Sequence, residues 1–272
     1  MYKIIVSDLD ETLLRRSDKR VSEADRVAIA KAGELGVKFV PTSGRGYRSM
    51  ERTLKELDLY GKADQYVISF NGGAITENRD NRLLFFQGLP FSLAEEFYRR
   101  GQRYDVCIHV YTIDTVYVYN FVQGERDFLK GRMEVVEVPD KTLDFLRGQE
   151  IVKCLYMNTD HAYLEKIARE LSDITGDTDV SYSSNRYLEF NKKGVNKGAG
   201  LRKLAELLGV DMKDTIAIGD NYNDITMIEA AGLGVGVQNT VEELKPRCDY
   251  VTRATCDESA VSEVINRFIL NA

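Results

Sequence analysis

Histidine is scarce in this sequence, whose 272 residues include only His109 and His161. A histidine-rich metal centre or a Ser-His-Asp triad therefore has little material from which to be built. The four cysteines are scattered and form no CxxC pair. This spacing argues against a zinc site and against disulfides, and it favours free thiols in a reducing cytosol.

Long apolar runs and an excess of basic residues are also missing. No apolar stretch approaches the roughly 20 residues that a membrane-spanning helix requires, and the apolar run Ile4–Val6 ends before Asp8, so no targeting segment is expected. The net charge is −6, with acids and bases mixed along the chain, and we expect no nucleic-acid partner. The 43% of hydrophobic and 29% of charged residues are typical of a globular protein. These features predict a cytoplasmic protein without a membrane partner.

Strand-like and helix-like segments alternate at both ends of the chain. Apolar segments at 4–8, 37–43 and 65–70 are separated by helical patterns. The alternation resumes with a helical pattern over 197–208 and the apolar segment 215–220. Strands that are apolar on both faces and alternate with helices predict an α/β fold with a Rossmann-like, doubly wound parallel sheet.

The pattern between these two parts differs. Residues 106–112 and 115–120 are rich in β-branched residues and tyrosine, which is typical of an antiparallel hairpin. A mixed series of strands and helices follows. The simplest organisation is a discontinuous α/β core, 1–83 and 190–272, with an α+β domain inserted at 84–189.

Four polar clusters lie where the predicted core strands end or where a core helix begins. In an open parallel sheet, ligands bind in the crevice at the carboxyl ends of the strands. Asp8 and Asp10 follow the first strand, and in extended backbone their side chains point to the same side. Two carboxylates so close together are costly unless a cation or a proton separates their charge states. The four clusters are Asp8–Thr12, Thr42–Arg45, Lys197 and Gly219–Asp224.

Further carboxylates accompany this pair. Asp220 and Asp224 add oxygen ligands, and no cysteine or histidine lies near them in the sequence. An acidic set made only of oxygen donors favours a hard cation. The most plausible is Mg²⁺, which keeps several waters and bridges to phosphate oxygens.

Four motifs follow one another along the chain: DLDET, TSGR, the lysine in GVNKG, and GDNYND. They resemble the four motifs of the haloacid dehalogenase superfamily of aspartyl phosphotransferases. Together with the place and size of the insertion, they resemble its Cof-type sugar-phosphatase branch, which carries a type IIB cap. The resemblance implies that the domain inserted at 84–189 is such a cap, and we expect it to close over the site and exclude water. The resemblance covers residues 1–70 and 191–272. The cap is identified only by its place in the chain and by its mixed pattern of strands and helices. The resemblance implies a Mg²⁺-dependent phosphatase that hydrolyses small phosphorylated metabolites, sugar phosphates first among them, through an aspartyl-phosphate intermediate.

The resemblance also implies a role for each motif residue. Asp8 would be the nucleophile, and Asp10 would protonate the leaving oxygen and then deprotonate the attacking water. Mg²⁺ would be held by the Asp8 carboxylate, the Asp10 backbone carbonyl and the Asp220 carboxylate, with Asp224 in support. The residues expected to contact phosphate or substrate are Leu9 through its amide, Ser43, Gly44, Lys197, Asn223 and Asn71.

Two alternatives stay open beside this reading. A sugar phosphomutase would need a bisphosphate activator, and a non-catalytic phospho-acceptor, like a response-regulator receiver, also gathers aspartates, Ser/Thr and Lys around Mg²⁺.

The glycine-rich run 232–237 imitates a dinucleotide fingerprint, but it is interpreted as a closely packed strand. Arg45 is interpreted as a structural salt-bridge partner. The substrate and the oligomeric state cannot be predicted from the sequence.

Overall fold

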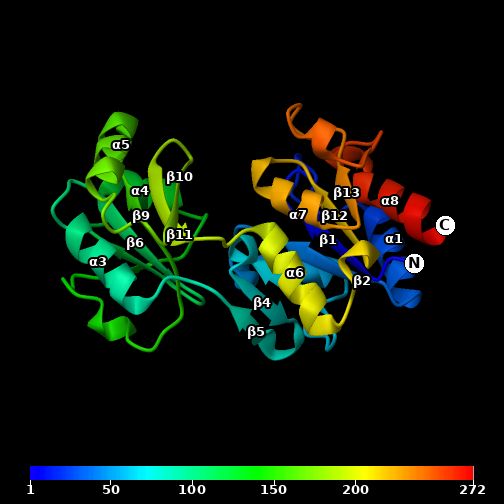
Figure 1. The fold of residues 1–272 in the computed structure, drawn as a ribbon, viewed down its shortest axis with the longest axis horizontal. Helices are drawn as coiled ribbons and strands as arrows, with labels where there is room; N and C mark the ends of the chain where they lie inside the picture. The colour runs from blue at the N-terminus through cyan, green and yellow to red at the C-terminus, as the bar shows by residue number, and fades with distance from the viewer. Residues whose placement is uncertain (272) are drawn as a thin grey trace. The chain divides into compact units, whose positions relative to one another are not determined.

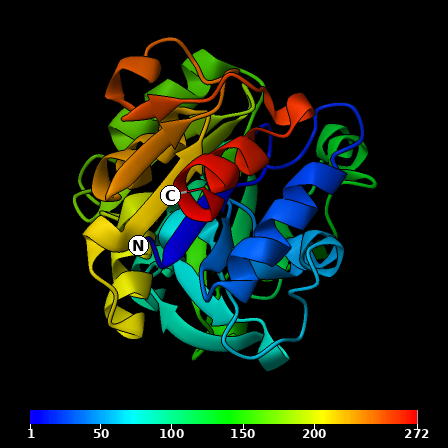
Figure 2. The same cartoon turned by 90° about the vertical axis from the view of Figure 1, so that its right-hand side faces the viewer.

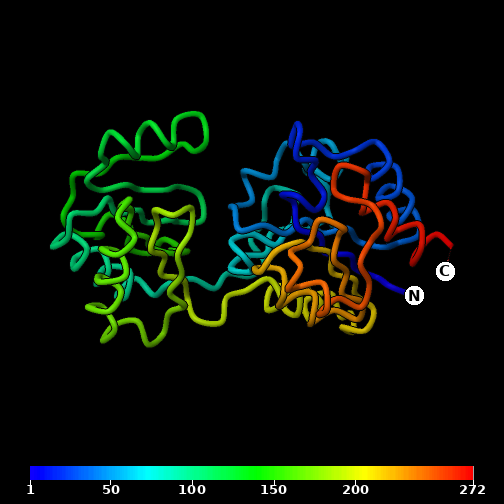
Figure 3. The backbone as a smooth tube through the Cα atoms, turned by 90° about the horizontal axis from the view of Figure 1, so that it is seen from above, coloured from blue at the N-terminus to red at the C-terminus, as the bar shows by residue number. Residues whose placement is uncertain are grey.

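The computed structural model describes residues 1–271, which divide into two compact units. The core comprises Met1–Phe86 and the segment from Asn196 onward, and the cap comprises Gln87–Val195. Both ends of the chain belong to the core, and the residues between them form the cap (Figure 3). Among residues 1–271, no helix combines the length and the apolar character that crossing a membrane requires.

The core is built on an eight-stranded sheet of order β14-β13-β12-β1-β2-β3-β4-β5 (Figure 1). The strands from β14 to β3 run parallel, as the α/β fold class predicted, whereas β4 and β5 pair antiparallel and were not predicted. A short turn between β3 and β4 reverses the chain, and such a connection can join only antiparallel neighbours. The strands are β1 Ile4–Asp8, β2 Lys38–Thr42, β3 Tyr66–Ser69, β4 Ala74–Glu77, β5 Arg82–Phe86, β12 Thr215–Gly219, β13 Leu233–Gly236 and β14 Tyr250–Val251.

Helices cover both faces of this sheet (Figure 2). On one face, Leu201 and Leu204 of α6 and Met227 of α7 pack against Ile4 and Val6 of β1. Helices α1 and α8 pack against each other on the other face. The doubly wound α/β class predicted from the sequence is thus confirmed. The core helices are α1 Glu23–Glu34, α2 Glu51–Glu56, α6 Lys197–Leu208, α7 Ile225–Ala230 and α8 Ala260–Ile265.

The cap has a six-stranded sheet of order β10-β11-β9-β6-β7-β8. The predicted hairpin is present as the antiparallel pair β6 and β7. One face of the sheet buries Ile108, Tyr156 and Phe190 with Phe97 of α3 and Leu164 of α5. The elements are α3 Phe91–Gly101, β6 Cys107–Thr112, β7 Val116–Tyr119, α4 Gln123–Leu129, β8 Val136–Glu137, β9 Ile151–Met157, α5 His161–Glu170, β10 Thr178–Ser183 and β11 Tyr187–Lys192.

Strand pairing sets the limits of the two units. The boundaries expected from the sequence, 83/84 and 189/190, fall inside β5 and β11. Strand β5 pairs with β4 throughout its length and so belongs to the core sheet, and β11 lies between β9 and β10 in the cap sheet. The limits therefore lie at Phe86 and Val195, because splitting a strand would leave its ladder hydrogen bonds unpaired.

Candidate active site

Asp8 is the last residue of β1, which lies between β12 and β2 in the middle of the core sheet. The chain passes from β1 to β2 on one side and later returns to β12 on the other, so the strand order reverses at β1. This reversal is the topological switch point at which open α/β sheets bind ligands. Because the three strands are parallel, Asp220 after β12 and Ser43 after β2 emerge at the same edge as Asp8.

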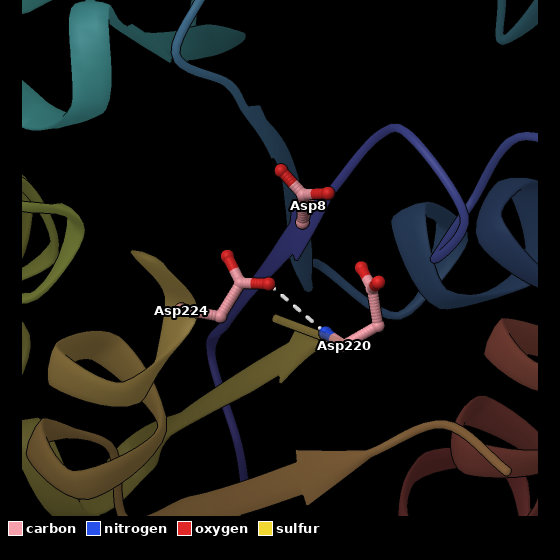
Figure 4. A group of neighbouring side chains, drawn as sticks. All are labelled: Asp8, Asp220 and Asp224. Carbon is pink, nitrogen blue, oxygen red and sulfur yellow. Dashed lines mark hydrogen bonds between the residues drawn. The ribbon is translucent and has the colours of Figure 1, made fainter. Parts of the chain in front are cut away.

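Three buried carboxylates meet at this edge. Asp8, Asp220 and Asp224 each offer an oxygen, and these oxygens lie within 4.8 Å of one another. Figure 4 shows Asp8 and Asp220 at the ends of their strands and Asp224 on the turn that precedes α7. Gly219 makes room for that turn, since a Cβ at this position would collide with the Cβ of Asp224. The sequence therefore concentrates negative charge in one buried place.

One buried lysine faces this cluster. Lys197 is the first residue of α6, whose cap Asn196 accepts a hydrogen bond from the amide of Ala199. Its Nζ donates to Oδ1 of Asp8 and, at 2.5 Å, to Oδ1 of Asp224. One cation against three carboxylates leaves an excess of negative charge, which a divalent cation would balance.

Burial dominates the ionisation of the cluster. It raises the pKa of Asp8 to about 7, against the opposing attraction of Lys197 and with help from the neighbouring charge of Asp224. Burial likewise raises the pKa of Asp220 to about 6, although the hydrogen bond from Thr12 works against it. Burial opposes the charge of Lys197, but Asp8 and Asp224 outweigh it and raise the pKa of the lysine. Without a bound metal ion, the cluster of carboxylates therefore retains protons near neutral pH.

These shifts predict a pH dependence of stability for the Mg²⁺-free protein. Since the pKa of Asp8 rises from 3.8 in the unfolded chain to about 7 in the folded one, folding favours the protonated acid. The contribution of Asp8 to the free energy of unfolding is therefore complete below about pH 4 and is lost as the pH rises to about 7. Relative to Asp8→Asn, the free energy of unfolding of the wild type should fall by about 2–4 kcal/mol across this window. Urea titrations in EDTA measure it, and parallel curves for the two proteins would contradict the assignment.

The donor set fits a small hard cation. All three side chains of the cluster offer oxygen, which Mg²⁺ prefers. Thr12 donates a hydrogen bond to Oδ1 of Asp220 at 2.6 Å, which orients this carboxylate and leaves its Oδ2 for a ligand. Both oxygens of Asp224 already accept hydrogen bonds, Oδ1 from Lys197 and Oδ2 from the amides of Asp220 and Asn221. Asp8 and Asp220 are thus the better placed ligands.

Asp10 lies outside the buried cluster. Strand β1 ends at Asp8, and the chain turns because the carbonyl of Leu9 accepts the amides of Leu13 and Leu14. Asp10 is about half exposed, and its carboxylate accepts a hydrogen bond from Nη2 of Arg45 at 2.7 Å. An ion pair this exposed contributes at most about 1 kcal/mol to stability. Its evident effect is to orient the carboxylate of Asp10.

Some of the predicted site residues line a pocket, and others are buried beneath it. A pocket is lined by Asp8, Asp10, Ser43, Gly44 and Asn223, with Glu11, Arg45, Asp220 and Asn221. Lys197 and Asp224 are fully buried behind Asp8, and the side chain of Leu9 points into the core. Asn71 lies against Gly44, and its Oδ1 accepts a hydrogen bond of 3.4 Å from Nδ2 of Asn223.

Sequence reasoning missed the contact of Thr12, which is part of the first motif but received no role. Arg45 was interpreted as a structural salt-bridge partner, and it forms such an ion pair with Asp10. For Thr12, the available signal was its place in the same motif as Asp8 and Asp10. Which side chain each of the two residues contacts depends on how the loops fold back, and spacing does not report that.

The fold and the acidic switch point define an enzyme class. A sequence model of the haloacid dehalogenase-like hydrolases matches residues 5–265. The chain therefore belongs to this family, and the membership expected from its motifs is confirmed, as is the expectation of a hydrolase.

Particular relatives match along their whole length. The Bacillus subtilis protein named "Putative phosphatase YxeH" is 30% identical over 99% of both chains. A second B. subtilis protein, the 5-amino-6-(5-phospho-D-ribitylamino)uracil phosphatase YcsE, is 28% identical over 98% of this chain and 96% of its own. The crystal structure of a haloacid dehalogenase-like hydrolase from Bacteroides thetaiotaomicron superposes with a TM-score of 0.85 at 30% identity, covering 99% of this chain and 100% of the other.

Proposed function

We propose that the protein is a Mg²⁺-dependent phosphatase that hydrolyses small phosphorylated metabolites through an aspartyl-phosphate on Asp8. The observation that carries the proposal is the buried contact of Asp8 with Lys197 beside Asp220, at the switch point of the sheet. Catalysis of phosphoryl transfer depends almost entirely on positioning the reactants and compensating their charge. This arrangement of Asp8, Lys197 and Asp220 is suited to both.

The reaction has two transfers. A carboxylate oxygen of Asp8 attacks phosphorus, the ester P–O bond breaks, and Asp10 gives its proton to the departing oxygen. A water then attacks the same phosphorus, Asp10 takes a proton from that water, and the bond between Asp8 and phosphorus breaks to release inorganic phosphate. The position of Asp10 in the same pocket as Asp8 supports this division of roles.

The proposed metal ligands are the carboxylates of Asp8 and Asp220 and the backbone carbonyl of Asp10. Asp224, whose two oxygens are already engaged, would support the site by holding Lys197 and the amide of Asp220. When bound, Mg²⁺ would supply the positive charge that keeps Asp8 anionic near neutral pH and balances the phosphoryl oxygens.

The proposed contacts to the phosphoryl group come from the loops around Asp8. Ser43 and the amides of Gly44 and Leu9 would donate hydrogen bonds, and Lys197 would compensate charge between nucleophile and phosphate. Asn223 and Asn71 would complete the contacts, and their mutual hydrogen bond supports a shared task. Donors fixed in advance act on charge as it develops, without a cost of reorganisation.

Sugar or polyol phosphates are the proposed substrates. The relative YcsE is named for a phosphate ester on a ribityl chain, and the family scaffold is shared along the full length of both proteins.

The proposed compartment is the cytoplasm. Free thiols support a reducing compartment, and four cysteines are free: Cys107, Cys154, Cys248 and Cys256.

Turnover of p-nitrophenyl phosphate tests the proposal. With Mg²⁺, the purified protein should release phosphate over many cycles, and EDTA should lower the rate at least about 100-fold, because the loss of a Lewis acid costs several kcal/mol. Excess Mg²⁺ should restore it. Equal rates in EDTA and in Mg²⁺ would refute the metal requirement.

The same assay separates the alternatives. A phosphomutase would require a bisphosphate and return an isomer of the substrate rather than free phosphate. A phospho-acceptor would take up one phosphoryl group per chain, most readily from acetyl phosphate, and then stop.

A further inference from the structure

The turn between β3 and β4 has an unusual backbone. Phe70, Asn71 and Gly72 all adopt positive φ angles, of 52°, 54° and 97°. Glycine tolerates this region and asparagine visits it, but a phenylalanine there is uncommon. Each such non-glycine residue costs on the order of 1–2 kcal/mol. The surrounding structure must therefore enforce the conformation.

The turn holds the loop that carries Ser43 and Gly44. The amide of Phe70 donates to the carbonyl of Arg45 at 3.0 Å, and the amide of Asn71 donates to the carbonyl of Ser43 at 2.9 Å. The ring of Phe70 lies where a Cβ on Gly46 would be, 2.8 Å from its Cζ. Left-handed residues are what direct these two successive amides toward one neighbouring loop.

The same turn contacts the start of the helix that carries Lys197. A Cβ on Gly72 would collide with the carbonyl oxygen of Asn196, the cap of α6, and would lie 3.1 Å from the amide of Gly200. A real Cβ cannot approach a backbone oxygen so closely, so a side chain at Gly72 must displace either the turn or the helix. Lys197 follows Asn196 directly.

We propose that the turn Phe70–Gly72 is a positioning element, which fixes the Ser43–Arg45 loop and Lys197 relative to each other, with Gly72 as a positioning residue for Lys197. The inference rests on the proposed function. It assigns a task to the backbone of the turn, beyond the substrate contact proposed for the Asn71 side chain. The hydrogen bonds to Ser43 and Arg45 and the close approach of Gly72 to Asn196 hold the strained turn in place.

Gly72→Ala tests the contact with α6. The rate constant kcat for p-nitrophenyl phosphate should fall about 100-fold, as expected for a catalytic group displaced by about 1 Å. The inhibition constant of inorganic phosphate should rise, whereas the affinity for Mg²⁺ should be unchanged because Asp8 and Asp220 are held by other strands. The matched control is Gly61→Ala, which imposes a positive φ of 68° on alanine with no atom within 4 Å and should leave kcat unchanged.

A second pair of variants remains informative if Gly72→Ala does not fold. Asn71→Gly and Asn71→Ala both remove the side-chain amide, but only glycine is at ease with the left-handed backbone. We expect Asn71→Gly to exceed Asn71→Ala several-fold in kcat/KM. Equal values for these two variants would overturn the proposal, as would a crystal structure of Gly72→Ala with Lys197 unmoved. Wild-type turnover reports separately on the proposed function, so the two failures are distinguishable.

Discussion

Replacement of Asp8 by asparagine should abolish turnover, with kcat reduced at least about 10⁴-fold, as is found for the loss of a covalent nucleophile. An amide oxygen does not form the acyl phosphate, and a neutral amide at this position would also bind Mg²⁺ more weakly than the carboxylate. The measurement is the steady-state release of phosphate at saturating substrate and Mg²⁺, with mass spectrometry to follow phosphorylation of the chain.

Stability separates this effect from misfolding. Burial already disfavours the charge on Asp8, so at pH 7 Asp8→Asn should be at least as stable as the Mg²⁺-free wild type. Asp18→Asn is the matched control, because Asp18 is exposed and its carboxylate is paired with Arg15 and the amide of Arg20, which belong to its own loop. It should retain full activity. A phosphorylated or active Asp8→Asn would remove Asp8 from the mechanism.

Replacement of Lys197 by methionine should lower kcat by about 10³-fold and the free energy of unfolding at pH 7 by about 3–5 kcal/mol, the usual cost of leaving buried charges unpaired. Methionine matches the lysine stem in length, so packing is preserved. Asp8 and Asp224, in contrast, lose the cation to which both are hydrogen-bonded. Urea unfolding and single-turnover kinetics measure the two losses.

Two further variants divide the effect of Lys197 into charge and chemistry. Adding Asp224→Asn to Lys197→Met removes one unpaired carboxylate, and it should recover part of the stability without recovering activity. Lys203→Met, on the same helix and paired at the surface with Glu206, should change neither quantity. If Lys197→Met were as active as the wild type, the lysine would have no role in compensating phosphate charge.

Local pattern predicted most of the core. The helix expected over 197–208 is α6, Lys197–Leu208, because its cap and its apolar positions are local signals. The meeting of Asp8 with Asp220 follows from general geometry, since the carboxyl ends of parallel strands share one edge. Short-range chemistry and sheet geometry are sufficient for these features.

Other features arise from contacts between segments far apart in the sequence. The hydrogen bond of Arg45 to Asp10 and that of Thr12 to Asp220 depend on how two loops turn back. The pair Asn71-Gly72 is a sequence signal for a turn, but the sequence does not indicate the left-handed backbone of Phe70, which tertiary hydrogen bonds impose. Strand β4 was not predicted, and the expected boundary at 83/84 divided β5, because a short apolar run does not indicate which sheet it joins.

The pairing of β1 with β12 aligns Ile4 with Thr215, so β1 acquires this neighbour only after the ribosome has made the whole cap that lies between them in the sequence. Until then Asp8 lacks Asp220 and Lys197, so the site proposed to hydrolyse phosphate esters is incomplete in the nascent chain. The cap residues between them, Gln87–Val195, form a compact unit of their own, which shortens the loop that the late strand must close. Translation order thus delays the onset of catalysis until both parts of the core have been made.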